Sequence, residues 1–155
     1  MTTYYFDTSG LIKRYVTETG SGWVWRLFSP EFDHFFLTSR LTMPEIYSAL
    51  ARRLREGSVS AAAYSSNLQV FQRDSTTTYR YIELTMDVVN LSRDLLAQHA
   101  LRASDAVQLA SALGANRLLV TGGLAPLVFV AADERLLAVA RAEGMAGENP
   151  NDYAV

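Results

Sequence analysis

The stretch that decides the fold is Tyr4-Tyr5-Phe6-Asp7-Thr8-Ser9-Gly10, close to the start of the chain. Its three aromatic residues predict a short buried strand, and the residues after them predict a polar turn where this strand ends. Leu11-Ile12-Lys13-Arg14-Tyr15-Val16 continues as a predicted helix that stops near Gly20. A buried strand followed directly by a helix is typical of a βαβ unit, so this stretch predicts the beginning of a parallel sheet.

Strands and helices continue to alternate along the rest of the chain. Further strands are predicted over 35–38, 79–84 and 127–130, and further helices over 22–28, 44–57, 60–71, 88–99, 104–122 and 133–140. Pro44 suits an early helix position, and Ser60 can cap the helix that follows it. Residues 118–120 are assigned to a helix rather than to a separate strand, and 144–155 is predicted to be a loop. The alternation predicts an α/β fold with helices on both faces of a short parallel sheet.

The composition agrees with one packed domain over residues 1–155. The chain is 49% apolar and 19% charged, which is typical of a globular core. It contains no apolar run long enough to cross a bilayer and no secretory leader, so we expect a soluble, cytoplasmic protein with no membrane partner. The absence of cysteine excludes disulfides and thiolate zinc sites, and there are only two histidines, His34 and His99. Any catalytic metal would therefore be held mainly by oxygen, which favours Mg²⁺ or Mn²⁺.

Four carboxylates stand where the predicted strands end or the predicted helices begin: Asp7, Glu45, Asp105 and Asp133. In parallel sheets the functional crevice lies beyond the carboxyl ends of the strands. Four acids at such positions could converge on one or two divalent cations. The alternative interpretation is that each one only stabilises a helix start, Asp7 and Asp133 as caps and the other two as first-turn acids, with Ser104 capping the helix at Asp105. Periodicity alone does not decide between them.

A cluster of acids around a hard cation suits phosphodiester hydrolysis. Cleavage by water requires an activated nucleophile and stabilisation of the charge on the phosphoryl and leaving oxygens. Magnesium takes only a few carboxylates and leaves other positions to water or substrate phosphate. The four acids therefore make a metal-dependent nuclease a concrete hypothesis.

Four segments of the chain, in this order, resemble the PIN-domain family, and most closely its VapC-type toxin branch. They are Tyr5-Phe6-Asp7-Thr8-Ser9-Gly10-Leu11-Ile12, Pro44-Glu45-Ile46-Tyr47-Ser48-Ala49-Leu50, Ser104-Asp105-Ala106-Val107-Gln108-Leu109-Ala110 and Phe129-Val130-Ala131-Ala132-Asp133-Glu134-Arg135-Leu136. The similarity extends from Tyr4 to about Pro150. It implies a PIN-like α/β/α sandwich and an endoribonuclease that depends on Mg²⁺ or Mn²⁺.

The resemblance also implies roles for individual residues. Asp7 and Asp105 would be direct metal ligands, and Glu45 and Asp133 would complete the metal shell. Thr8 or Ser9 would place a hydroxyl beside Asp7, although Ser9 could equally be a helix cap. The family further implies an RNA substrate, a small cognate antitoxin and a homodimer.

Most of the basic residues that could bind RNA are arginines, because the chain has thirteen arginines and one lysine. Arg52 and its neighbours Arg53 and Arg55 could contact phosphates, although a solvated helix face explains them about as well. Lys13 and Arg14 have no better claim. The formal net charge of −2 weakens any expectation of tight, indiscriminate binding to nucleic acid.

Other interpretations are weaker. Trp23 and Trp25 could stack on bases, but packing in or near the core is the better prediction. An aspartate-nucleophile phosphatase would need a second aspartate two residues after Asp7, where Ser9 stands. A serine hydrolase is disfavoured because neither histidine lies in a motif. The main alternative is a PIN-like module that binds RNA or protein without cleaving it.

Overall fold

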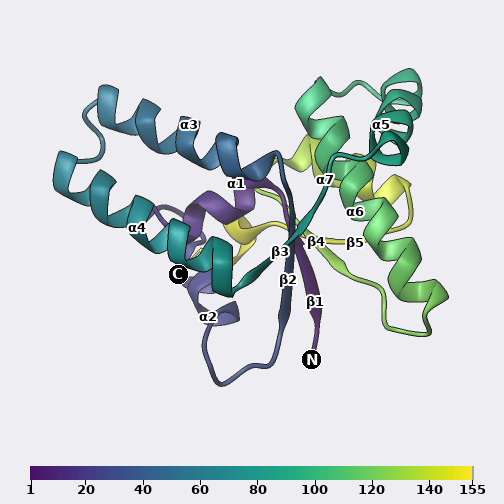
Figure 1. Cartoon of the computed structure of the whole chain (residues 1–155), viewed down its shortest axis with the longest axis horizontal. Helices are drawn as coiled ribbons and strands as arrows, with labels where there is room; N and C mark the ends of the chain where they lie inside the picture. Colours follow the sequence, from purple (N-terminus) through teal and green to yellow (C-terminus); the bar gives the residue numbers. More distant parts are fainter. Residues whose placement is uncertain (155) are drawn as a thin grey trace.

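The computed structural model describes residues 1–154 as a five-stranded sheet between two layers of helices (Figure 1). The strands are β1 (Thr3–Phe6), β2 (Phe35–Ser39), β3 (Tyr79–Ile82), β4 (Val128–Val130) and β5 (Ala146–Glu148). The helices are α1 (Thr8–Leu11), α2 (Ser21–Leu27), α3 (Thr42–Arg55), α4 (Ala61–Thr77), α5 (Met86–Gln98), α6 (Ala103–Thr121) and α7 (Glu134–Ala142). Two short 3₁₀ turns, η1 (Ile12–Arg14) and η2 (Pro150–Tyr153), complete the chain.

The sheet is parallel throughout, with the strand order β3-β2-β1-β4-β5. β1 lies at its centre, where Tyr5 pairs with Leu37 on β2 and with Phe129 on β4. A central parallel strand is covered on both faces, which explains why the opening aromatic run does not alternate with polar residues. The predicted α/β class and the predicted parallel sheet are confirmed.

Successive side chains of β1 supply two separate cores, because neighbouring residues on a strand point to opposite faces. Tyr5 packs with Leu109 of α6 in one core, and Phe6 packs with Ile46 of α3 in the other. Figure 1 shows the same division, with α1–α4 on one side of the sheet and α5–α7 on the other. The result is the expected α/β/α sandwich.

The capping predictions are confirmed in part. Ser60 caps α4 by accepting a hydrogen bond from the backbone N–H of Ala63, and residues 118–120 belong to α6 as predicted. Ser104 does not cap α6, because Arg102 occupies the N-cap position and contributes no side-chain bond there. Helix α6 thus begins two residues earlier than a cap at Ser104 predicts.

The prediction of a loop over residues 144–155 is wrong. Residues 146–148 form β5, which pairs with β4, and residues 150–153 form a 3₁₀ turn. The short run Ala-Gly-Glu has no apolar alternation that would mark a strand. It is a strand because its backbone extends an existing sheet, and because Gly147 leaves room for Leu137, whose Cδ2 would lie 2.8 Å from an added Cβ.

The two tryptophans of α2 differ in their surroundings. Trp23 is half-buried, but Trp25 is 45% exposed, so the prediction of core packing fails for Trp25. Its indole N–H still donates to the carbonyl of Arg14 at 3.1 Å. Among residues 1–154, no helix combines the length and the hydropathy needed to cross a membrane.

Candidate active site

The predicted acids lie beyond the carboxyl ends of the central strands. Asp7 follows β1 directly, Glu45 is in the first turn of α3 after β2, Asp105 is in the first turn of α6, and Asp133 follows β4. The strand order reverses at β1 and β4, and such a switch point is where open parallel sheets bind ligands.

Asp7 is held by both its backbone and its side chain. Its N–H donates to the carbonyl of Val130 at 2.9 Å, which ties the end of β1 to β4. Its Oδ2 accepts hydrogen bonds from the N–H of Ser9 at 3.1 Å and from the Ser9 hydroxyl at 2.5 Å. The Ser9 hydroxyl also accepts from the N–H of Ala132, next to Asp133. Ser9 therefore joins the first acid to the loop that carries the last one.

The second oxygen of Asp7 is available to a ligand. Oδ1 accepts no hydrogen bond from any group in residues 1–154, yet no fully buried side-chain oxygen or nitrogen in this part of the chain lacks a partner. Oδ1 therefore reaches solvent, although the residue as a whole is only 5% exposed. A carboxylate with one oxygen anchored and one open can bind a cation without losing its position.

The environment of Asp7 opposes its negative charge. Burial, and to a smaller extent the nearby charges of Glu45 and Asp105, raise the pKa of Asp7 from its ordinary 3.8 to about 6, against the lowering effect of the bonds from Ser9. A buried acid beside two other acids lacks a compensating positive charge. Perturbed groups of this kind concentrate at functional sites, and a bound cation would relieve the repulsion.

Glu45 is anchored in the same one-sided way. Its Oε1 accepts hydrogen bonds from the Thr8 hydroxyl at 2.9 Å and from Nε2 of Gln108 at 2.8 Å. Of the two hydroxyls predicted beside Asp7, Ser9 does contact Asp7, whereas Thr8 contacts Glu45. Gln108 has no role in the sequence-based interpretation. The signal that could have found it is a lone amide on the buried face of a helix otherwise lined by Ala106, Leu109 and other apolar residues.

Asp105 and Asp133 share a small hollow of about 20 Å³, which Arg102 and Arg135 also line. Asp133 caps α7 through Oδ1, which accepts from the N–H of Arg135 and of Leu136. Asp105 lies 3.6 Å from the exposed guanidinium of Arg102. Asp7 and Asp133 therefore do cap helices, as the alternative interpretation expects. In each residue only one carboxylate oxygen makes the capping hydrogen bonds.

The acids lie near one another but do not form a preformed metal cage. Within the part of the chain that the structure describes, no three histidine or acidic side chains converge as a ready metal site. Mg²⁺ does not need such a group, since it keeps several waters and takes one or two carboxylates. The all-oxygen donor set and the uncompensated charge around Asp7 fit a hydrated hard cation.

The basic residues proposed from the sequence lie elsewhere. Lys13 is buried and donates to Glu18 and to the carbonyl of Thr19, and Arg14 is paired with the buried Asp74. Arg52 is exposed in the last turn of α3, seven residues after Glu45, which corresponds to roughly 10 Å along the helix. Lys13 and Arg14 therefore stabilise the fold, and Arg102 and Arg135 are the arginines beside the acids.

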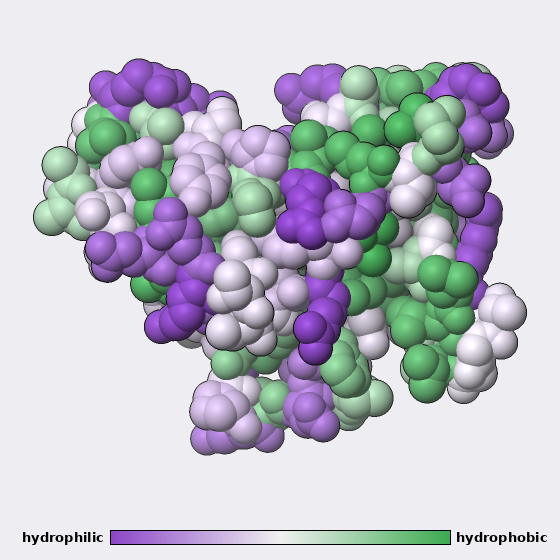
Figure 2. All heavy atoms as spheres, in the orientation of Figure 1, coloured by the Kyte–Doolittle hydropathy of each residue, from purple (hydrophilic) through white to green (hydrophobic). Residues whose placement is uncertain are grey.

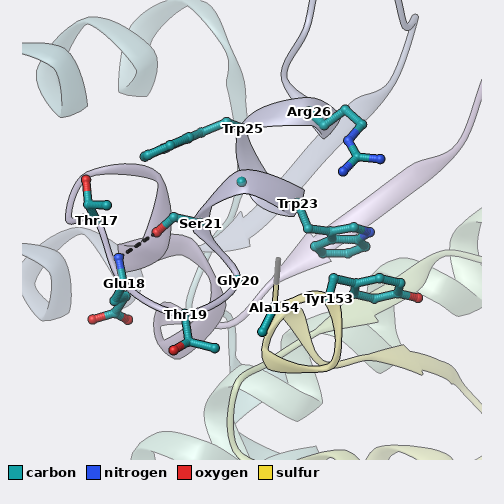
Figure 3. Close-up of a pocket in the computed structure, with 11 residues that line it drawn as sticks. Thr17, Glu18, Thr19, Gly20, Ser21, Trp23, Trp25, Arg26, Tyr153 and Ala154 are labelled. Atoms are coloured by element: carbon teal, nitrogen blue, oxygen red, sulfur yellow. Dashed lines mark hydrogen bonds between the residues drawn. The ribbon is translucent and has the colours of Figure 1, made fainter.

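A second, wider hollow is not part of this acidic site. It measures about 550 Å³ and lies between α2, the loop before it and the turn at 150–153 (Figure 3). Trp23 stacks on Tyr153 with ring centroids 4.7 Å apart, and Trp25 lies on the other side of the hollow in Figure 3. None of the four acids lines it. The Trp23–Tyr153 stack attaches the end of the described chain to α2.

Comparison with known proteins identifies close relatives. Two curated proteins of Mycobacterium tuberculosis, Ribonuclease VapC45 and Ribonuclease VapC49, are each 38% identical to this chain over 111 residues. The aligned region is 70% of this chain and 74% of each relative. No protein-family profile matches the chain.

Three solved structures share the fold. The crystal structure of VapBC2 from Rickettsia felis, bound to a promoter DNA fragment, matches with a TM-score of 0.64 at 12% identity and covers 95% of this chain and 98% of that one. A toxin-antitoxin complex from Klebsiella pneumoniae matches at 0.59 with 17% identity, and FitAcB from Neisseria gonorrhoeae at 0.62 with 13%. Each covers 95% of this chain and has 97% of its own length matched. Because the chain is 38% identical to two VapC ribonucleases and shares this fold, it belongs to the VapC ribonuclease family of PIN-domain proteins.

Proposed function

We propose that this chain is an endoribonuclease that depends on Mg²⁺ or Mn²⁺ and hydrolyses RNA phosphodiester bonds as the toxin of a toxin–antitoxin pair. The observation that carries the proposal is Asp7, a buried carboxylate at the switch point of the sheet with one open oxygen and two other acids close enough to raise its pKa. Its relatives in Mycobacterium tuberculosis are named ribonucleases, which supports the same activity here.

In this proposal each of the four acids has its own role. Asp7 and Asp105 would hold the cation directly, and Glu45 and Asp133 would complete its shell directly or through water. When bound, the cation supplies an activated water and neutralises charge on the phosphoryl oxygens. Ser9 keeps Asp7 in place through Oδ2, and Thr8 keeps Glu45 in place through Oε1. The free Oε2 of Glu45 can then orient the attacking water and accept its proton.

The substrate contacts follow from the charges around the acids. Arg102 and Arg135 line the hollow between Asp105 and Asp133, where they can hold the phosphates on either side of the scissile bond. Arg52 is a more distant candidate that could contact the RNA strand beyond the cleavage site. With a net charge of −2, affinity must come from this local arrangement rather than from the overall field.

A direct test uses Asp105→Asn beside the exposed control Asp94→Asn, with a labelled single-stranded RNA as substrate. We expect the wild-type protein and the control to cleave in Mg²⁺, EDTA to abolish cleavage, and Mn²⁺ to restore it. Asp105→Asn should lose activity, because a neutral amide is a poor ligand for a hard cation. Cleavage by Asp105→Asn at the rate of the control would rule out this assignment of the site.

A second candidate function is a PIN-like module that binds RNA or protein without cleavage. It is favoured by one observation: within residues 1–154 no three histidine or acidic side chains converge as a metal site. Mn²⁺ binding and RNA cleavage by the purified protein distinguish the two candidates. A nuclease should bind Mn²⁺ and cleave RNA. An inactive module should leave the RNA intact and bind it equally well with Mn²⁺ and with EDTA.

Protein partners are part of the proposal. The similar structure from Klebsiella pneumoniae is a complex of a toxin with an antitoxin, and we propose a cognate small antitoxin and a homodimer for this chain as well. Exposed apolar side chains gather over α5 and the far end of α6 (Figure 2), among them Met86 and Leu118. Light scattering on the purified chain tests for the dimer. We also propose that residues 1–155 act as one domain and that the protein works in the cytoplasm.

A further inference from the structure

Gln108 is a polar side chain in the middle of the apolar face of α6. It is 1% exposed and is among the largest fully buried side chains of the described residues. Its two polar atoms reach two other elements: Oε1 accepts from the hydroxyl of Tyr5 on β1 at 2.8 Å, and Nε2 donates to Thr42 and Glu45 on α3 at 2.9 and 2.8 Å. Because α3 and α6 lie on opposite faces of the sheet, this amide links the two helical layers beside the acids.

The hydroxyl of Tyr5 determines which way the amide faces. This hydroxyl donates a hydrogen bond to the side-chain amide of Gln108 at 2.8 Å. A donor at this point requires the carbonyl oxygen of Gln108, which leaves the NH₂ group to face Glu45. The ring of Tyr5 is itself fixed by stacking on Phe129, with centroids 5.6 Å apart.

This arrangement restrains an otherwise mobile carboxylate. A glutamate side chain loses rotamer entropy when it is fixed, so it stays in one position only if other groups hold it there. Oε1 of Glu45 receives two donors, Gln108 and Thr8, and Oε2 receives none from residues 1–154. Gln108 thereby determines which oxygen stays anchored and which one is presented to the site.

We propose that Gln108 is a positioning residue that, together with Tyr5, holds Glu45 ready to complete the metal shell. The inference rests on the function proposed above. It assigns to a buried amide of α6 the role that groups outside the direct ligands commonly have at metal sites, where their loss lowers metal affinity by about 10–100-fold.

The first experiment compares Tyr5→Phe with Tyr79→Phe. Both changes remove one buried tyrosine hydroxyl that makes a hydrogen bond, but Tyr79 belongs to a network with Tyr15 on the other side of the sheet. Mn²⁺ binding is measured by electron paramagnetic resonance, and the melting temperature of each variant in EDTA is recorded beside it. We expect Tyr5→Phe to bind Mn²⁺ several-fold more weakly and Tyr79→Phe to bind like the wild-type protein, whatever their melting temperatures.

The second experiment uses Gln108→Met, which keeps the length of the side chain and removes its amide. In the folded variant we expect about a 10-fold loss of Mn²⁺ affinity, with kcat reduced and KM for RNA unchanged. If Gln108→Met does not fold, Tyr5→Phe carries the test alone.

The outcomes separate this inference from the proposed function. If the wild-type protein binds Mn²⁺ and cleaves RNA, but Tyr5→Phe and folded Gln108→Met bind the ion as the wild type does, the positioning role is refuted and the nuclease assignment stands. An equal loss of Mn²⁺ affinity in Tyr79→Phe would refute it too, because the effect would then be a general one. If the wild-type protein binds no Mn²⁺, both the function and the role of Gln108 are overturned.

Discussion

Replacing Asp7 with asparagine should abolish activity and, in the absence of metal, make the protein more stable. The pKa of Asp7 is raised to about 6 from its ordinary 3.8. A shift of about two pKa units corresponds to roughly 3 kcal/mol between the two protonation states. Ionising Asp7 in the folded protein therefore costs about that much, and a neutral asparagine removes the cost while its carbonyl still accepts from Ser9.

The dependence on pH follows from the sign of the shift. The folded state binds the Asp7 proton more tightly than the unfolded state does, so the stabilisation from this proton is fully present below pH 3.8 and is lost as pH rises through 6. The advantage of Asp7→Asn over the wild-type protein should thus be near zero at pH 4 and reach about 3 kcal/mol by pH 8. For a chain of this size that is a rise in melting temperature of roughly 6–12 °C.

The assay is thermal unfolding in EDTA at pH 4, 6 and 8, with the exposed Asp94→Asn as the matched control. We expect the control to stay within about 0.5 kcal/mol of the wild type, as surface changes usually do. Adding Mg²⁺ at pH 8 should stabilise the wild type and leave Asp7→Asn unchanged. If Asp7→Asn is no more stable than the wild type at pH 8 in EDTA, ionised Asp7 does not destabilise the folded protein and the reasoning is refuted.

Two further predictions concern packing and substrate binding. Gly10→Ala should destabilise the protein by about 1–3 kcal/mol, because its Cβ would lie 3.0 Å from the carbonyl oxygen of Val130. Gly114→Ala should stabilise α6 by roughly 0.5–1 kcal/mol, because an added Cβ there would meet no atom within 4 Å. Chemical denaturation measures both, and equal effects would contradict the packing argument. Arg102→Ala should weaken RNA binding in EDTA and reduce the salt slope by about 0.7, whereas Arg117→Ala, roughly 22 Å further along α6, should change neither.

Much of the architecture could be predicted because it depends on local patterns. The aromatic run of β1 and the apolar run of β4 are typical of strands covered on both faces, and the helix starts at Ser60 and Asp133 carry their own capping side chains. β5 could not be predicted, because its three residues become a strand only through hydrogen bonds to β4. Edge strands of this kind depend on a sheet that other residues have already built.

The acids themselves could be named from the sequence, because each stands at a strand end or a helix start. Their surroundings could not be predicted. Lys13 and Arg14 lie near Asp7 in the chain, yet both are engaged in ion pairs that stabilise the fold. Arg102 and Arg135 line the hollow beside the acids instead, since sequence distance does not measure distance across a sheet.

The sequence by itself determined the order of the first four strands and of the helices around them, and it nominated the four acids as candidate metal ligands. Only the tertiary structure decided that Thr8 holds Glu45, that Ser9 joins Asp7 to the loop before Asp133, and that Gln108 connects both helical layers. The physical reason is the distance along the chain over which each kind of interaction acts. Periodicity and capping act within a few residues along the chain, whereas the hydrogen bonds that hold Glu45 join positions up to 63 residues apart and exist only once the sheet has brought them together.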